Sequence, residues 1–156
     1  MVFLVFQLDE GRFALDARQV VEVLPFVEVR QIPQAPAGVA GIIDFRGTPV
    51  PVVDLSLVVV GRPARRHLST RLIVVHCVDH SGHTRLLALI AEKATQTMRR
   101  EPREFVHSGI TNDRAPYLGP VAADDHGLVQ WIDASQLLPA PVREVLSIPT
   151  TAPGSP

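Results

Sequence analysis

The sequence predicts an all-β protein, built as two five-stranded β-barrels with short helical turns. About ten short apolar segments alternate with turns rich in glycine, proline and aspartate, a spacing typical of barrels and sandwiches. Valine and leucine supply most of the apolar side chains, since there is one Trp and one Tyr, and an excess of valine favours strands. With 156 residues, of which 46% are hydrophobic, the chain can form one ordinary domain or two very small ones sharing an interface.

The first element is a predicted hairpin. Residues Val2–Leu8 form an apolar run, a turn follows at 9–11, and Phe13 and Leu15 then alternate with polar neighbours. Asp16 is placed to cap a short helical turn in the segment that follows.

That helical turn is expected to carry Val20 and Val23/Leu24 on one face and to end at Pro25, because proline has no backbone donor. A strand pattern resumes at residues 27–29.

A loop dense in proline and glycine, residues 33–41, precedes a second predicted hairpin. Its strands are Ile42–Arg46 and Val50–Leu55, joined through Gly47 and Thr48. Pro49 and Pro51 predict that the second strand lies at an edge or carries a bulge, since each removes a ladder donor.

Residues 61–67 resemble a linker and are taken as the boundary between two halves. The second half repeats the strand pattern at residues 71–78, 85–91, 117–121 and 128–132, and Asp133 is placed to cap a short helix that carries Leu137 and Leu138. We therefore expect one domain over residues 1–148, with subdomains at about 1–58 and about 68–134, a C-terminal helical turn at 134–148 and a disordered tail at 149–156.

Charge and targeting patterns restrict the function classes. Fifteen basic and sixteen acidic residues give a formal net charge of −1, without the concentrated positive charge that nucleic acid or an anionic membrane attracts. The apolar N-terminus stops after eight residues and has no basic flank, so we expect a cytoplasmic protein without direct membrane insertion.

Two arginine runs support one alternative, a small β-barrel that binds nucleic acid. They are Arg62/Arg65/Arg66 and Arg99/Arg100/Arg103. Single-strand binding needs aromatic stacking platforms beside the charge, and the nearest aromatic residue is Phe105. Solvated loop charges are the preferred interpretation, so no nucleic acid is expected as a partner.

Chemistry-bearing residues do not form a recognisable catalytic or metal-binding pattern. The six histidines (His67, His76, His80, His83, His107 and His126) lack the carboxylate or thiolate company that metal sites use, and Cys77 is expected to be a buried hydrophobe. Phosphate-binding loops and a nucleophile elbow are also missing from the sequence. We therefore predict no enzyme activity, no catalytic residue, no metal and no cofactor.

The most specific segment of the sequence runs from Ile32 to Leu55. It contains a Pro-x-x-Pro loop at 33–36, Gly-Ile-Ile-Asp-Phe-Arg-Gly at 41–47 and Val-Pro-Val-Val-Asp-Leu at 50–55. In order and spacing these elements resemble the CheW-like family, with Asp44 and Phe45 where the family has Asn and Leu. The resemblance extends over nearly the whole chain, although Glu92 replaces an aspartate and the glycine before the 87–94 segment is lost.

The resemblance implies SH3-like barrels and a scaffold function. The implied partners are the signalling tip of a methyl-accepting type chemoreceptor and the regulatory domain of a CheA-like histidine kinase. The implied location is the cytoplasm, with recruitment to receptor arrays.

The resemblance also implies two binding surfaces. The receptor-binding groove maps to eight residues: Val20, Glu22, Val23, Gly41, Ile43, Phe45, Arg46 and Gly47. Within it we expect a Glu22–Arg46 ion pair beside the groove and a close approach of the partner backbone at Gly41, while Ile43 and Phe45 are equally compatible with the core. Candidates for kinase binding are Leu87, Leu89 and Ile90.

Overall fold

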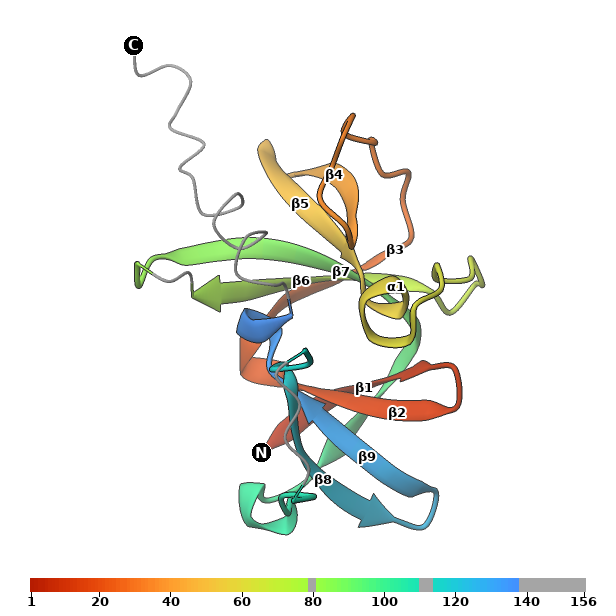
Figure 1. Cartoon of the computed structure of the whole chain (residues 1–156), viewed down its shortest axis with the longest axis vertical. Coiled ribbons are helices and arrows are strands. Elements are labelled where there is room, and N and C mark those ends of the chain that lie inside the picture. The colour runs from red at the N-terminus through yellow and green to blue at the C-terminus, as the bar shows by residue number, and fades with distance from the viewer. Residues whose placement is uncertain (79–80, 110–113, 138–156) are drawn as a thin grey trace.

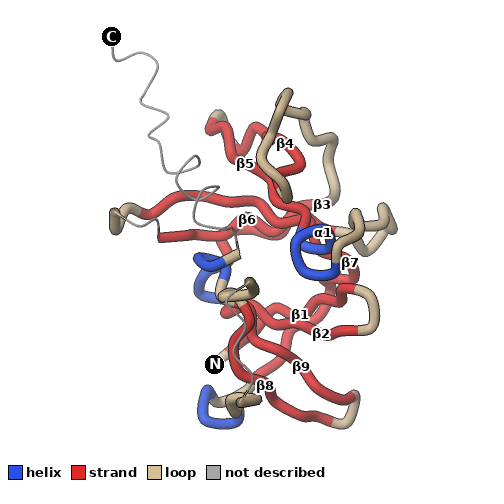
Figure 2. The backbone as a smooth tube through the Cα atoms, viewed as in Figure 1, coloured by secondary structure: helices blue, strands red, loops and turns tan. Residues whose placement is uncertain are grey.

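The computed structural model describes residues 1–78, 81–109 and 114–137, and within these the protein is all-β, as the sequence predicts (Figure 1). Figure 2 shows that the helical segments are short. Nine strands are described: β1 (Val2–Leu8), β2 (Gly11–Asp16), β3 (Val20–Pro25), β4 (Val39–Phe45), β5 (Thr48–Asp54), β6 (Arg71–Val78), β7 (Thr84–Arg99), β8 (Leu118–Asp124) and β9 (Gly127–Ile132).

The N-terminal hairpin and the cap after it agree with the prediction. Strands β1 and β2 pair antiparallel from Phe3↔Asp16 to Leu8↔Gly11. The Asp16 side chain accepts a hydrogen bond from the backbone N–H of Arg18 and caps a 3-10 helix, η1 (Ala17–Gln19).

The predicted helical face after Asp16 is wrong. The helix ends at Gln19, and Val20–Pro25 is strand β3, which pairs antiparallel with β6 and carries an irregularity between Val20 and Glu22. Valine at three of six positions fits a strand better than a helix, because its branched side chain packs well on a pleated surface. Residues 27–29, where a strand was expected, do not form one. An isolated bridge joins the next residue, Arg30, to Ile42.

Strands β4 and β5 form the second predicted hairpin. Phe45 pairs with Thr48 across a two-residue turn whose residues, Arg46 and Gly47, have φ values of 52° and 85°. Two positive φ values in a two-residue loop match the twist of antiparallel strands, and glycine adopts this conformation at little cost. The side chain of Asp44 accepts a hydrogen bond of 2.7 Å from the Gly47 N–H and closes the turn.

Pro49 and Pro51 predicted that β5 lies at an edge or carries a bulge. The strand has neighbours on both sides over part of its length, and its pairing with β4 has a register irregularity at Val52 and Val53. It pairs antiparallel with β4 and parallel with β7, and the pairing with β7 covers only Val52–Asp54. Both prolines precede this stretch, so neither removes a donor that the β7 ladder needs.

A short helix, α1 (Leu55–Val60), follows β5 and was not predicted. Its N-cap is Asp54, whose side chain accepts a hydrogen bond from the Leu57 N–H, and its C-cap is Gly61 with φ 79°. Both end signals, an aspartate before the segment and a glycine after it, are present in the sequence.

The 16-residue strand β7 joins two parts of the sheet by pairing with β1, β5 and β6. Its first half pairs with β6 and β5, and its second half pairs with β1. Lys93, with φ 51°, lies at the register irregularity between these halves.

Two sets of five strands therefore share β7, and both sets mix strands from the two halves of the sequence. The β3 set comprises β3, β6, the first half of β7, β5 and β4. The β1 set comprises the second half of β7, β1, β2, β9 and β8. A division at residues 61–67 does not separate them, because β1 and β2 pair with β7 and β9 rather than with β3 to β5.

Three apolar clusters form the core. One belongs to the β3 set and includes Ile43, Phe45 and Ile90. Another belongs to the β1 set and centres on Phe3, Phe105 and Trp131, whose rings are about 5 Å apart. The largest contains side chains from both sets, so it holds the two sets together by apolar burial.

The strands and the helix cap at residues 118–137 also agree with the prediction. Strands β8 and β9 pair antiparallel around the turn between Asp124 and Gly127. Asp133 caps a 3-10 helix, η3 (Ala134–Gln136), and Leu137 is buried in the largest core cluster. The expected helical turn beyond residue 137, the tail at 149–156 and His80 lie outside the described residues.

Candidate functional site

Strand β3 lies at one end of the strand order and places the first residues of the predicted receptor groove. Within the described residues it pairs with β6 alone, so its other edge is open. Val20 and Val23 pair with Val75 and Ile73, and cross-strand partners share a face of the sheet, so the two valines lie on the same face; Val20 packs against the largest core cluster. Val23 is 39% exposed, which leaves an apolar strip at this edge of the sheet.

Val21 joins this strip and was missed by the sequence analysis. It is 36% exposed and occupies the irregular position between the paired residues Val20 and Glu22. The helical interpretation of this segment obscured it, since residues 20, 23 and 24 share a helix face and residue 21 does not.

The predicted Glu22–Arg46 ion pair is present. An Arg46 guanidinium nitrogen donates to a Glu22 carboxylate oxygen at 2.9 Å, and the two side chains are 69% and 35% exposed. Arg46 has a left-handed backbone conformation at the hairpin tip, with φ 52°. Its guanidinium lies 4.9 Å from the centre of the Phe45 ring.

The pair lies on the opposite face of β3 from Val23. Glu22 is aligned with Val74, whereas Val23 is aligned with Ile73, and neighbouring strand residues alternate between faces. A partner that binds along the open edge of β3 can therefore contact both Val23 and the Glu22–Arg46 pair. A partner that binds to one face of the sheet reaches only one of them.

Three of the predicted groove residues, Gly41, Ile43 and Phe45, are buried within the fold. Ile43 and Phe45 are buried in the core of the β3 set, which decides between the two interpretations that the sequence left open. At Gly41, a side chain would collide with the backbone carbonyl of Arg30. Within the chain, the close approach at Gly41 is that of the Arg30–Ile42 bridge.

The remaining groove residues lie at the periphery. Val20 is half-buried against the largest core cluster, and Gly47 is exposed with no atom within 4 Å of the position that a Cβ would take. The structure thus brings Val20, Glu22, Val23 and Arg46 to the open edge of β3, with Gly47 at the hairpin tip.

The three candidates for kinase binding are buried. Leu87, Leu89 and Ile90 are 5%, 0% and 5% exposed and belong to the core clusters. They occupy the half of β7 that pairs on one side with β6 and on the other with β5, and its two faces pack on different core clusters, Leu87 and Leu89 on the largest and Ile90 on that of the β3 set. Their side chains are not available to a partner.

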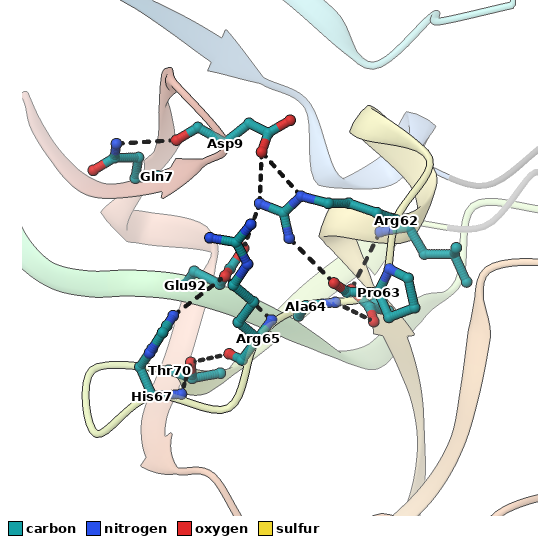
Figure 3. A network of polar contacts seen from close by, with 11 residues as sticks. Gln7, Asp9, Arg62, Pro63, Ala64, Arg65, His67, Thr70 and Glu92 are labelled. Carbon is teal, nitrogen blue, oxygen red and sulfur yellow. Dashed lines mark hydrogen bonds and ion pairs between the residues drawn. The ribbon is translucent and has the colours of Figure 1, made fainter.

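The linker-like stretch after α1 is fixed to the rest of the molecule by a polar network around Glu92 (Figure 3). Arg62 pairs with Asp9 at 2.7 Å and reaches Glu92 at 3.5 Å, and the Arg65 N–H donates to Glu92 at 3.1 Å. Glu92 is buried, and His67 approaches it at 4.0 Å. This network connects the β1–β2 turn of one strand set to the bend of β7.

Three of the six arginines in the two runs, Arg62, Arg66 and Arg100, make side-chain contacts within the molecule. The guanidinium of Arg66 lies 5.0 Å from the centre of the Phe26 ring, and Arg100 pairs with Glu104 and approaches Asp124. Together with the Arg62 pairs, these contacts reduce the free positive charge that a nucleic acid would meet.

Cys77 is a free thiol on β6 that packs against the largest core cluster. Burial, together with the nearby charge of Asp133, raises the pKa of the Cys77 thiol to about 12. A thiol with such a pKa is protonated at neutral pH and is a poor nucleophile.

Metal-ligating side chains do not converge in the part of the chain that the structure describes, where no group of three or more His, Cys, Asp or Glu residues could hold an ion. None of the helices described there is long and apolar enough to cross a membrane.

Comparison with known proteins assigns the chain to a family. A family model described as a CheW-like domain matches residues 2–142. Among solved structures, the chain is similar to the scaffolding protein TtCheW from Thermoanaerobacter tengcongensis, with 24% sequence identity, a TM-score of 0.78, and coverage of 90% of this chain and 89% of that one. That likeness supports the fold, and the match of the family model over nearly the whole chain shows that the protein belongs to the CheW-like domain family.

Proposed function

We propose that this protein is a non-enzymatic adaptor that couples a chemoreceptor-like protein to a CheA-like histidine kinase in bacterial chemosensory signalling. Family membership supports a scaffold function. The observation that carries the proposal is the open edge of β3, where exposed valines lie beside a solvent-accessible ion pair. Exposed apolar side chains next to a charge are typical of a protein-binding surface.

The receptor-facing part of the site comprises Val21, Val23, Glu22 and Arg46. An apolar strip of this kind suits the apolar face of a partner helix, with the ion pair fixing register at its margin. The ion pair itself adds about 0–1 kcal/mol to folding, because both partners are solvated. Its charges are therefore available for recognition at little cost to stability.

The kinase-binding surface is proposed to lie outside Leu87, Leu89 and Ile90, since these side chains are buried. Substituting them should impair kinase binding only by destabilising the fold.

The proposal is tested by titrating the full chain against the signalling tip of a receptor and the regulatory domain of a kinase encoded nearby. We expect both to bind, and we expect Arg46→Ala to weaken receptor binding by about 3- to 10-fold while leaving kinase binding and the far-UV circular dichroism unchanged. Arg103→Ala, which removes an exposed arginine far from β3 in sequence, is the matched control.

A charge swap separates recognition from structure. The double variant Glu22→Arg/Arg46→Glu keeps an ion pair of opposite orientation. If receptor binding is restored by the swap, the pair only supports the fold locally; if binding stays weak, the partner reads the individual charges. Failure of both partners to bind the unmodified chain would refute the adaptor proposal.

A further inference from the structure

The loop between α1 and β6 carries the most exposed large apolar side chain of the described residues. Leu68 is 99% exposed, although the loop around it is held in place. The Thr70 hydroxyl, which is buried, accepts a hydrogen bond from the His67 N–H at 3.0 Å and donates one to the Arg65 carbonyl at 2.6 Å. An ordered loop therefore presents a leucine to solvent, and a partner would not have to fix the loop in order to cover it.

A second unfavourable feature lies beside this loop. Lys93, the only lysine of the chain, is exposed and has φ 51°, a left-handed conformation that favours glycine. The next residue, Ala94, donates its N–H to the Ser69 carbonyl at 3.3 Å, so Lys93 and Leu68 each lie one residue from the same hydrogen bond. Neither burial nor an ion pair with a described carboxylate offsets the cost of these two residues. Costly features that gather at one place indicate a functional surface.

Arg71 connects this loop to the strip of exposed valines on β3. It is aligned with Pro25, two positions along β3 from Val23, so the Arg71 side chain lies on the same face of the sheet as Val23. Its guanidinium donates to the Leu68 carbonyl and forms no ion pair with a carboxylate in the part of the chain that the structure describes. The apolar strip therefore continues past the end of β3 to an exposed leucine flanked by two cations.

We propose that the receptor-facing strip extends from Val23 over Arg71 to Leu68 and Lys93, and that the partner helix carries an apolar side chain and carboxylates at this end. The inference rests on the proposed function, because the occupant is the same chemoreceptor-like helix. A fully exposed leucine gains the most from being covered by an apolar side chain. Cations without an acidic partner favour carboxylates on the occupant and disfavour basic residues there.

Lys93→Gly separates a binding role from a structural one. Glycine adopts a positive φ at lower cost, so this variant should be at least as stable as the natural chain in urea unfolding. It also removes a cation, so the signalling tip of the receptor should bind about 2- to 5-fold more weakly, with a smaller salt dependence. Lys93→Arg, which keeps the charge, should bind normally. A residue with only a structural role would not improve stability and weaken binding together.

Leu68→Ala tests the apolar contact. Because the side chain is 99% exposed, the variant should unfold at the same urea concentration as the natural chain. Binding of the receptor tip should weaken at least about 3-fold, since an apolar contact is lost. Leu128→Ala is the matched control, because Leu128 is 64% exposed on β9 in the β1 set and should not contact the receptor.

The outcomes distinguish the inference from the proposed function. If the natural chain binds the receptor tip and both Leu68→Ala and Lys93→Gly bind it equally well, the inference is overturned and the adaptor proposal stands. The inference is also overturned if these variants lose binding to the kinase regulatory domain, or to vesicles of phosphatidylcholine and phosphatidylglycerol, while receptor binding is unchanged. If the natural chain does not bind the receptor tip at all, the proposed function fails and the inference fails with it.

Discussion

Removing Asp124 should destabilise the protein far more than removing Glu22, although both carboxylates pair with an arginine. Asp124 accepts two hydrogen bonds from Arg12, at 2.8 and 2.9 Å, and a third from the His126 N–H at 2.8 Å. The Arg12 and Asp124 side chains are only 21% and 13% exposed. The pair connects β2 to the β8–β9 turn, which are 112 residues apart in sequence.

The expected magnitude follows from these contacts. Two-point arginine–carboxylate hydrogen bonds are stronger than neutral ones, and their loss leaves a partly buried guanidinium without its main partner. We expect Asp124→Ala to lower the free energy of unfolding by about 2–3 kcal/mol, between the values typical of exposed and buried pairs. Glu22→Ala, which breaks a single-point exposed pair, should cost about 0–1 kcal/mol.

The assay is urea unfolding of both variants, followed by far-UV circular dichroism and by Trp131 fluorescence. The free energies of unfolding are compared between variants whose m values equal that of the natural chain. An Arg12→Ala/Asp124→Ala double variant should recover part of the loss, giving a coupling energy of about 1–2 kcal/mol. Equal losses for Asp124→Ala and Glu22→Ala, or no coupling, would refute the argument that burial and two-point geometry determine the strength of these pairs.

The pH dependence gives the same prediction a second test. Hydrogen bonds from Arg12 lower the pKa of Asp124 from 3.8 to about 2. A folded-state pKa below the unfolded value means that the stabilisation is complete above about pH 4 and is lost as the pH falls toward 2. The difference in stability between the natural chain and Asp124→Asn should shrink across that window, and a difference that is constant from pH 5 to 2.5 would contradict the assignment.

Four further predictions concern the core, the backbone, the thiol and the buried carboxylate. Leu89→Ala should cost about 2–4 kcal/mol in urea unfolding, because Leu89 is fully buried in the largest core cluster; a cost below 1 kcal/mol would show that the site is not packed. Gly41→Ala should cost at least about 1–3 kcal/mol by the same measurement, since its Cβ would collide with a backbone carbonyl, and an unchanged stability would contradict the bridge at this point. Cys77 should react slowly with iodoacetamide at pH 8 and rapidly after unfolding, because burial raises the pKa of its thiol; equal rates in both states would contradict that burial. Glu92→Gln should speed proteolysis of the 61–67 stretch, since it weakens the polar contacts that hold the stretch against β7, and unchanged cleavage would show that those contacts are dispensable.

Local signals in the sequence predicted the short-range features correctly. Asp16 and Asp133 cap the helical turns at which they were placed, and glycine at position 47 fits the hairpin turn. These features depend on residues within a few positions of one another, so the sequence contains the whole interaction. The Glu22–Arg46 pair was predicted from the family resemblance, since its partners are 24 residues apart.

Strand β3 and helix α1 were both missed in the sequence, and a different contact determines each of them. Residues 20–25 and 55–60 are both rich in valine; the first segment was interpreted as helical, and no helix was predicted for the second. In β3 the backbone donors of the segment are satisfied by β6, about 50 residues away, which no local pattern reveals. In α1 the caps at Asp54 and Gly61 outweigh the weak preference of valine for strands.

The sequence by itself determined the all-β class, the family, the hairpin turns and the residues that form the exposed ion pair. Only the tertiary structure decided which apolar residues face solvent, because the same valine or leucine is core or surface according to the side chains that pack over it and its position in the sheet. Leu89 is buried in the largest core cluster on a central strand, whereas Val23, on a strand at the end of the sheet, is 39% exposed. The sharing of β7 between two strand sets likewise arises from pairings between distant segments, whose free energy depends on contacts that only the folded chain makes.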